Sequence, residues 1–342
     1  MRNRRFWLGL VISLVALYIA FRGIEFNLLW SALTQANYLA LVPAMAVILL
    51  AQVARAYRWG LLFYPSPAPP LSRLFSSLSI GYLVNTILPA RVGDIVRAVL
   101  IGDGQGPRVA QALSTIVVER ALDVFAIVAM LVLVLPFVSL TPLLQRSAAT
   151  VVIVFLVLIV ALWAIVWQRQ RAMTYIAWGL GRIPRINGDV WTNRVEGLID
   201  GLQILHAPRH LAVAGLWSLV IWGLGGVLYN YLVMRAFGLQ DQFGSLGGAL
   251  VAATFVQVVV ALGATVPSSP GYVGVYHAGV VLALGAFGFP QTEALAYALV
   301  AHAANFGLLI LIGAFYLWRE GLNLSQITGS GTAAADYEQA AG

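Results

Sequence analysis

Residues 74–101, LFSSLSIGYLVNTILPARVGDIVRAVLI, combine membrane-like hydrophobicity with a break and a group of charges. An α-helix needs about 20 mainly apolar residues to cross a bilayer core of about 30 Å, and this stretch is long enough. In its middle, residues 88–93 (LPARVG) interrupt the helical pattern, and Asp94 and Arg97 follow. Proline removes a backbone donor and glycine weakens a helix, so the stretch predicts two shorter helices joined by a break.

The composition of the whole chain extends this interpretation. Of 342 residues, 61% are hydrophobic and 10% are charged, and the mean hydropathy is +0.87. A soluble fold would expose more apolar surface than water tolerates, so the sequence predicts an all-α integral membrane protein. The chain has no cysteine, which removes disulfides and thiolate metal sites. Its net charge of +7 comes from arginines scattered beside apolar spans, which favours membrane topology and argues against nucleic-acid binding.

About six full transmembrane helices are expected from apolar segments of sufficient length. They lie at residues 7–21, 38–63, 111–136, 148–167, 211–236 and 292–318. Two further stretches, residues 74–101 and 245–289, are interrupted by proline and glycine. If the six plain spans each cross once, these two are opposed re-entrant hairpins in an inverted repeat, as in transporters whose broken helices line a cavity. The alternative is a pair of proline-kinked ordinary spans.

The arginine distribution predicts the orientation. Basic loops stay in the cytoplasm, and arginines flank the first broken stretch and fill residues 169–210. Both termini are therefore expected on the cytoplasmic side of the cell membrane. Residues 169–210 predict an amphipathic segment on the inner surface or, alternatively, a loop packed on the bundle. Residues 1–318 are expected to form one membrane domain, and residues 319–342 a disordered tail.

Charged residues within a membrane span are costly unless paired or hydrated, so each is a functional candidate. Around the first break, Pro89 is expected to open a half-helix whose free N–H groups and dipole favour an anion. Asp94 can pair with Arg91 or Arg97, which leaves one positive charge for a ligand such as a phosphate headgroup; the alternative is a self-contained structural network. Asn85 and Gly93 flank this group.

The next span carries Glu119, Arg120 and Asp123 within about one helical turn. Interhelical ion pairing is the favoured interpretation, ahead of proton relay and divalent-cation binding. On residues 38–63, Arg55 and Arg58 recur on one face. They predict contacts with anionic headgroups at a cavity mouth or, alternatively, snorkelling at the interface.

The second break repeats part of the first. It contains Pro267, Pro270, Gly271 and Gly274, with a serine N-cap and proline at the first helical position. Neutral donors surround it: Ser268, Ser269, Tyr272 and His277. His277 and His302 could in principle bind a metal, but hydrogen-bonded core histidines are the favoured interpretation, and no metal or cofactor is expected.

The motifs Asn85-x-x-Leu-Pro89-x-Arg91-x-Gly93-Asp94-x-x-Arg97, Glu119-Arg120-x-x-Asp123 and Pro267-x-x-x-Gly271-x-x-Gly274 together resemble the lysylphosphatidylglycerol synthase transmembrane region family. The resemblance covers nearly the whole chain. It implies the flippase-like membrane domain found alone in many bacteria and archaea, without the soluble aminoacyl-transferase domain of bifunctional members. The matching polar positions are Arg91, Asp94, Arg97, Glu119, Arg120 and Asp123.

The sequence therefore predicts a transporter that moves an anionic phospholipid or a polyprenyl-phosphate-type intermediate between leaflets. An intramembrane lipid transferase is the first alternative, weakened because arginines near its acids lower their basicity. The second is a scaffold for a lipid-modifying enzyme. Membrane lipids are the expected partners, and both an enzyme partner and a homo-oligomer stay open. The sequence does not name the cargo, the direction or the energy source.

Overall fold

The computed structural model describes residues 2–88, 91–103, 106–138, 146, 149–150, 152–154, 157, 203–266 and 268–323. Every regular element in these ranges is a helix, which confirms the predicted all-α class. The α-helices are α1 (Arg2–Phe21), α2 (Phe26–Gln35), α3 (Leu41–Leu61), α4 (Leu71–Ile87), α5 (Val92–Gly102), α6 (Gly106–Val134), α10 (Pro208–Trp222), α11 (Tyr229–Ala236), α12 (Leu246–Gly263), α13 (Val275–Gly285) and α14 (Gln291–Arg319).

Shorter elements join or interrupt these helices. A π-helix, Gly223–Leu228, connects α10 to α11. Single 3₁₀ turns occur at Tyr38–Ala40, Leu135–Phe137, Gln203–His206, Leu239–Phe243 and Pro270–Tyr272.

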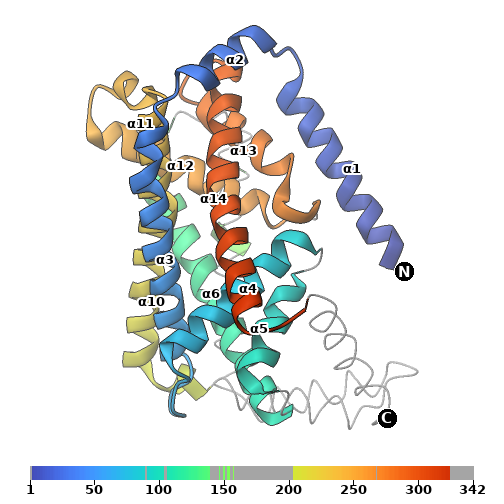
Figure 1. Ribbon diagram of the computed structural model, residues 1–342. Helices are drawn as coiled ribbons and strands as arrows, with labels where there is room; N and C mark the ends of the chain where they lie inside the picture. The colour runs from blue at the N-terminus through green and yellow to red at the C-terminus, as the bar shows by residue number, and fades with distance from the viewer. Residues whose placement is uncertain are drawn as a thin grey trace.

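The long helices form a bundle that carries the main apolar core. α3 packs on α10 and α11, and α12 packs on α6 and α11. Figure 1 shows α3 running along the bundle, where it packs on α10 and α14, with α2 across one end and α1 on the outside, where it packs on α13. Fully buried side chains such as Val233, Val256 and Tyr297 fill the space between α11, α12 and α14. The outer faces of the helices are also apolar, with many exposed large hydrophobic side chains. A bundle embedded in a membrane requires such an outer surface.

Four described helices are long and apolar enough to cross a membrane: Tyr38–Leu61, Pro208–Ala236, Leu246–Gly263 and Gln291–Arg319. A fifth is possible if Trp7–Phe21 and Phe26–Gln35, bent by 87°, count as one span. Three of the four coincide with predicted spans. The fourth, α12, was expected as half of a broken hairpin, and α6 coincides with the predicted span 111–136. The predicted span 148–167 and the amphipathic segment 169–210 lie largely outside the described residues, as does most of the predicted tail.

The first predicted break separates α4 from α5, and the two helices pack against each other. Gly93 donates its backbone N–H to Asn85 Oδ1 at 2.7 Å. A Cβ on Gly93 would collide with the carbonyl oxygen of Gly81, so two glycines allow the helices to touch. Pro89 lies outside the described residues. The expectation of a half-helix opened by Pro89 needs correction, because α5 begins at Val92 after a left-handed Arg91 (φ 54°).

The second predicted break separates α12 from α13. Pro270 opens a 3₁₀ turn as expected at the first helical position, but α13 begins only at Val275. Ser269 occupies the N-cap position of that turn, as predicted, but its side chain makes no capping hydrogen bond. Gly271 (φ 69°) and Gly274 (φ 88°) adopt left-handed backbone conformations that favour glycine. Pro267 lies outside the described residues.

The two breaks lie against each other in space. The 3₁₀ turn Pro270–Tyr272 packs on α4, and Gly271 lies beside Thr86 at the end of that helix. Arg91 Nη2 donates to the Ala264 carbonyl oxygen at 3.3 Å, just past the end of α12. The two breaks in the helical pattern are therefore in direct contact in the folded protein.

Exchanging Gly93 for alanine should destabilise the α4–α5 pair. The added methyl meets the Gly81 carbonyl oxygen and the Asn85 side chain, and overpacking of this kind costs about 1–3 kcal/mol. Gly307→Ala in the middle of α14 is the matched control. It has open space around its Cβ position, and better helix propensity should leave stability unchanged or raised by about 0.5–1 kcal/mol.

Thermal unfolding of both purified variants in detergent, followed by tryptophan fluorescence, tests this pair. Equal melting temperatures for the two variants would contradict the close packing of α4 on α5.

Candidate functional site

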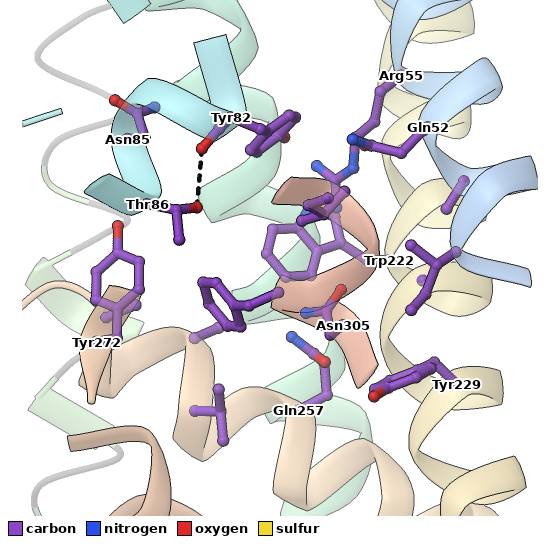
Figure 2. Close-up of a pocket in the computed structure, with 18 of the residues that line it drawn as sticks. Gln52, Arg55, Tyr82, Asn85, Thr86, Trp222, Tyr229, Gln257, Tyr272 and Asn305 are labelled. Carbon is purple, nitrogen blue, oxygen red and sulfur yellow. Dashed lines mark hydrogen bonds between the residues drawn. The ribbon is translucent and has the colours of Figure 1, made fainter. Parts of the chain in front are cut away.

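A cavity of about 230 Å³ lies between the two breaks and the long bundle. Its walls come from α3, α4, α5, α6, α12, α13 and α14, from the loop after α12, and from the π-helix region between α10 and α11. Figure 2 shows side chains from these elements facing a shared space, including Arg55, Trp222 and Tyr272. Apolar and aromatic groups make up most of the wall, with polar groups at selected points. This composition is typical of a ligand site.

Behind one wall lies a buried ion pair between α5 and α6. The Arg97 guanidinium donates to both carboxylate oxygens of Glu119, at 3.2 Å from Nη1 and 3.0 Å from Nη2. The two side chains are 1% and 2% exposed. The Arg97 guanidinium also lies 4.8 Å from the centre of the Trp59 ring. A two-pronged pair of this kind provides the geometry needed to offset desolvation of both charges.

A second buried pair connects α3 to α6. Arg58 Nη1 lies 2.6 Å from Asp123 Oδ1 and 2.7 Å from the Ser218 hydroxyl on α10. Asp123 also accepts a hydrogen bond of 3.0 Å from the Trp222 indole N–H. Arg58 is 0% exposed, so its charge depends on these partners. Three helices are thereby fixed around Asp123.

A third set of contacts closes the network at the cavity wall. Asp94 accepts from Arg120 Nη2 at 3.0 Å and lies 3.4 Å from Arg97 Nε. Arg120 also approaches Glu119 and Asp123, at 3.6 and 3.5 Å. The network joins Arg58, Arg97 and Arg120 to Asp94, Glu119 and Asp123. Three positive and three negative formal charges cancel within it.

Two further arginines line the cavity outside this network. Arg55 lies one turn before Arg58, and its guanidinium lies 5.2 Å from the centre of the Trp222 ring. Arg91 is exposed, and its one side-chain hydrogen bond goes to the Ala264 carbonyl. Within the described part of the chain, neither guanidinium is ion-paired with a carboxylate. These two cavity charges therefore have no ion-pair partner among the described residues.

Uncharged amides line the far wall of the cavity. Gln257 Oε1 accepts from Asn230 Nδ2 at 3.1 Å, and Asn230 Oδ1 accepts from the Tyr297 hydroxyl at 2.6 Å. The amides of Gln257 and Asn305 point toward one another in Figure 2. Gln52 is 3% exposed, and its Nε2 has no hydrogen-bond partner among the described residues. Neutral polar groups thus continue the site away from the arginines.

The predicted binding residues divide into two groups. Those that line the cavity are Arg55, Asn85, Arg91, Asp94, Arg120 and Tyr272. Those that do not are Arg58, Arg97, Glu119, Asp123, Ser268, Ser269 and His277. Headgroup binding by Arg58 and Arg97 needs correction, because both guanidinium groups are buried against carboxylates. The prediction that Glu119 and Asp123 pair with arginines of other helices is confirmed, and Arg91 is the charge that the first break leaves unpaired.

The amide donors expected at the first half-helix are partly used by the protein. Gly93 N–H is bound by Asn85, and Asp94 N–H is bound by the Arg91 carbonyl at 3.1 Å. Two of the backbone donors that were expected to face an anion at this helix start are therefore occupied by the protein itself.

The residues of the second break serve mainly to hold that break. Ser269 N–H donates to the Ser13 hydroxyl of α1 at 2.7 Å. His277 Nδ1 accepts from Gly274 N–H at 3.3 Å, and His302 Nε2 lies 2.8 Å from the Gly271 carbonyl oxygen. The favoured interpretation of both histidines as hydrogen-bonded core residues is confirmed. Among the described residues, no group of three metal-binding side chains comes together.

Sequence reasoning missed several cavity residues. Tyr82, Trp222, Asn230, Gln257 and Asn305 were not among the predicted binding residues. An isolated amide in an apolar helix is a usable signal, and Gln257 and Asn230 both fit it. The glycines of the π-helix are another: a Cβ on Gly226 would lie 2.6 Å from Gln257 Cγ, so glycine lets α12 approach. Such π-helical insertions often occur at functional sites.

Fold and cavity together define a multi-pass α-helical membrane protein with a positively charged internal site. The chain belongs to the lysylphosphatidylglycerol synthase TM region family, whose model matches residues 6–313. A UPF0104 membrane protein of Methanothermobacter thermautotrophicus is 24% identical over 255 residues, which cover 70% of this chain and 73% of that protein. No solved structure matches the chain.

Arg58→Ala should destabilise the protein far more than Arg55→Ala, although the two residues lie one turn apart on α3. Loss of Arg58 leaves Asp123 buried without its closest partner, and breaking a buried pair costs about 3–5 kcal/mol. Loss of Arg55 removes a charge that is ion-paired with no described carboxylate, so the melting temperature should change little. Differential scanning fluorimetry in detergent compares the two, and an equal loss in both variants would contradict the division between network and cavity arginines.

Proposed function

We propose that this protein moves an amphipathic lipid with an anionic headgroup between the leaflets of the cell membrane through the cavity between the two breaks. The observation that carries the proposal is the pair of arginines, Arg55 and Arg91, that face the cavity while the neighbouring charges neutralise one another. Uncompensated positive charge inside a membrane protein is costly and marks a site for an anion. A phosphate group supplies the acceptor oxygens that guanidinium groups bind.

The surroundings of the two arginines support a lipid rather than a small ion. Aromatic rings lie beside the charges, including Trp222, Tyr272 and Phe306. The remaining lining contains aliphatic groups such as Ile48, Val260 and Leu309. A phospholipid presents the matching sequence of a charged phosphate and apolar carbon.

The arrangement of the broken helices supports a transport role for the cavity. Non-helical backbone at membrane depth is tolerated where it is buried or lines a cavity, and both breaks lie at this one. We propose that α4–α5 and α12–α13 are opposed re-entrant hairpins related as an inverted repeat, with both termini in the cytoplasm. In this arrangement, a headgroup held between the breaks is equally distant from the two leaflets.

The transferase alternative has less support from the site. A general base or a metal ligand needs an available carboxylate, but Asp94, Glu119 and Asp123 each contact at least two arginines. That pairing favours a structural role for the acids. A scaffold role would not need two unneutralised arginines in an internal cavity.

Removing either cavity arginine should slow lipid exchange. A hydrogen bond to a charged group contributes about 1.5–3 kcal/mol, so Arg55→Ala and Arg91→Asn should each lower the rate by about tenfold or more. Asparagine tolerates the left-handed backbone at position 91 and tests the charge alone. Arg91→Lys, which keeps a positive charge, should retain more activity than Arg91→Asn.

The measurement is leaflet exchange of fluorescent phosphatidylglycerol in liposomes that contain the purified protein. Arg235→Ala, an exposed arginine outside the cavity, is the control and should exchange lipid at the original rate. The proposal fails if folded Arg55→Ala and Arg91→Asn proteins both exchange lipid at the control rate, or if the unmodified protein exchanges none.

A further inference from the structure

The amide wall of the cavity holds hydrogen-bond donors that the protein itself does not use. Gln52 Nε2 is buried and has no hydrogen-bond partner among the described residues, although an unsatisfied buried amide costs about as much as a lost hydrogen bond. Gln257 uses only its oxygen, toward Asn230, and no side-chain hydrogen bond is formed by Asn305 among the described residues. An unused, nearly fully buried donor facing a cavity indicates an acceptor that arrives with the ligand.

The amide donors lie next to the cavity arginines along one wall of the cavity. Gln52 precedes Arg55 by three residues, so both side chains leave the same face of α3. Figure 2 shows Gln52 and Arg55 extending from α3 toward Trp222, with Gln257 and Asn305 beyond the indole. A phosphate bound at Arg55 would therefore place the group attached to it next to the amides.

Carboxylate acceptors are scarce in the same space. Asp94 is the one acidic side chain among the described lining residues, and Arg97 and Arg120 both hold it. A cationic group on the ligand would find two unpaired arginines and no unpaired carboxylate. Like charges brought together at low dielectric repel strongly.

We propose that the cavity selects a phosphodiester headgroup that ends in an uncharged, hydroxyl-bearing group, that Gln52 donates to that group, and that a cationic terminal group is rejected. This inference rests on the proposed function for its biological meaning, but it concerns binding and is tested by binding. Carboxamides suit hydroxyl groups because each amide both donates and accepts. Selectivity then comes from a matched donor as well as from repulsion of the wrong charge.

The test measures binding of short-chain lipids to the full-length protein in detergent by native mass spectrometry. Dioctanoyl phosphatidylglycerol, its lysyl ester and dioctanoyl phosphatidylmethanol form the panel. All three carry the same acyl chains and a phosphodiester. Their terminal groups are a glycerol, a glycerol with added positive charge, and a methyl group without a hydroxyl. Phosphatidylglycerol should bind about tenfold more tightly than each of the other two.

Gln52→Leu separates recognition from structure. The variant should bind phosphatidylglycerol about as weakly as phosphatidylmethanol and leave phosphatidylmethanol binding unchanged. It should melt at the same or a higher temperature, because it removes a buried donor that has no partner among the described residues. Gln242→Leu, an exposed glutamine outside the cavity, should change neither affinity.

Equal or tighter binding of the lysyl ester overturns the inference, and so does phosphatidylglycerol binding that Gln52→Leu leaves intact. The proposed transport function is judged separately, by leaflet exchange. A protein that binds phosphatidylglycerol selectively without exchanging it would uphold this inference and defeat the transport proposal.

Discussion

The contact between Arg97 and Glu119, extended through Arg58, Asp123, Asp94 and Arg120, is the constraint on which the rest of the structure depends. Six charges lie in or beside a membrane bundle, and four of them, on Arg58, Arg97, Glu119 and Asp123, are buried. Buried ions are tolerated only when their partners are held in place, so the network fixes α3, α5 and α6 relative to one another. It also fixes α10, through Ser218 and Trp222. The cavity keeps its shape because its charged wall cannot rearrange without breaking several of these pairs.

Charge cancellation inside the network gives the cavity its chemistry. Had two more acids been present, one beside Arg55 and one beside Arg91, the cavity would be neutral and would have no preference for an anion. Trp222 links the two systems, because its ring lies beneath the Arg55 guanidinium while its N–H binds Asp123. One side chain thus holds a structural carboxylate and positions a ligand-facing arginine. Cation–π contact can stabilise a desolvated guanidinium by about 2 kcal/mol without neutralising it, which suits a binding site that is empty part of the time.

The sequence predicted those parts of the fold that depend directly on residue type, such as the length of apolar helices and the positions of breaks. Apolar length identified α1, α3, α6, α14 and the α10–α11 span, and proline with glycine located both breaks. The charged motifs led to the right region, since Arg91 and Arg55 line the cavity. Which arginine pairs with which acid could not be predicted, because residues 58 and 123 meet only through tertiary packing. Arg55 and Arg58 look alike in sequence and lie on neighbouring turns of α3, yet Arg55 lines the cavity whereas Arg58 pairs with Asp123, and the helices packed around each residue decide the difference.

The amides and the π-helix show the other limit of sequence reasoning. Gln257 and Asn230 lie in different spans, and their hydrogen bond depends on glycines that let α12 approach the π-helix. No local pattern encodes that approach. Helix starts were also misjudged by a few residues, because Arg91 and Gly274 adopt left-handed conformations that delay α5 and α13. The position of a proline does not predict these late starts of α5 and α13. A proline indicates where one helix must end, but it does not fix the residue at which the next helix begins.

The helices around the cavity are held with different strength, and this difference indicates which of them could move when a lipid passes. The charged network ties together α3, α5, α6 and α10, whereas α12 and α13 meet the first break mainly through Arg91 at the Ala264 carbonyl and Gly271 beside Thr86. Those contacts are a long hydrogen bond and van der Waals packing, which separate at far lower cost than a buried ion pair. In the proposed transport cycle, movement therefore belongs to the α12–α13 side of the cavity. Because Arg91 bridges the two sides, a phosphate that recruits its guanidinium would compete with Ala264 and weaken the link between the breaks, so binding and opening would be coupled through one side chain.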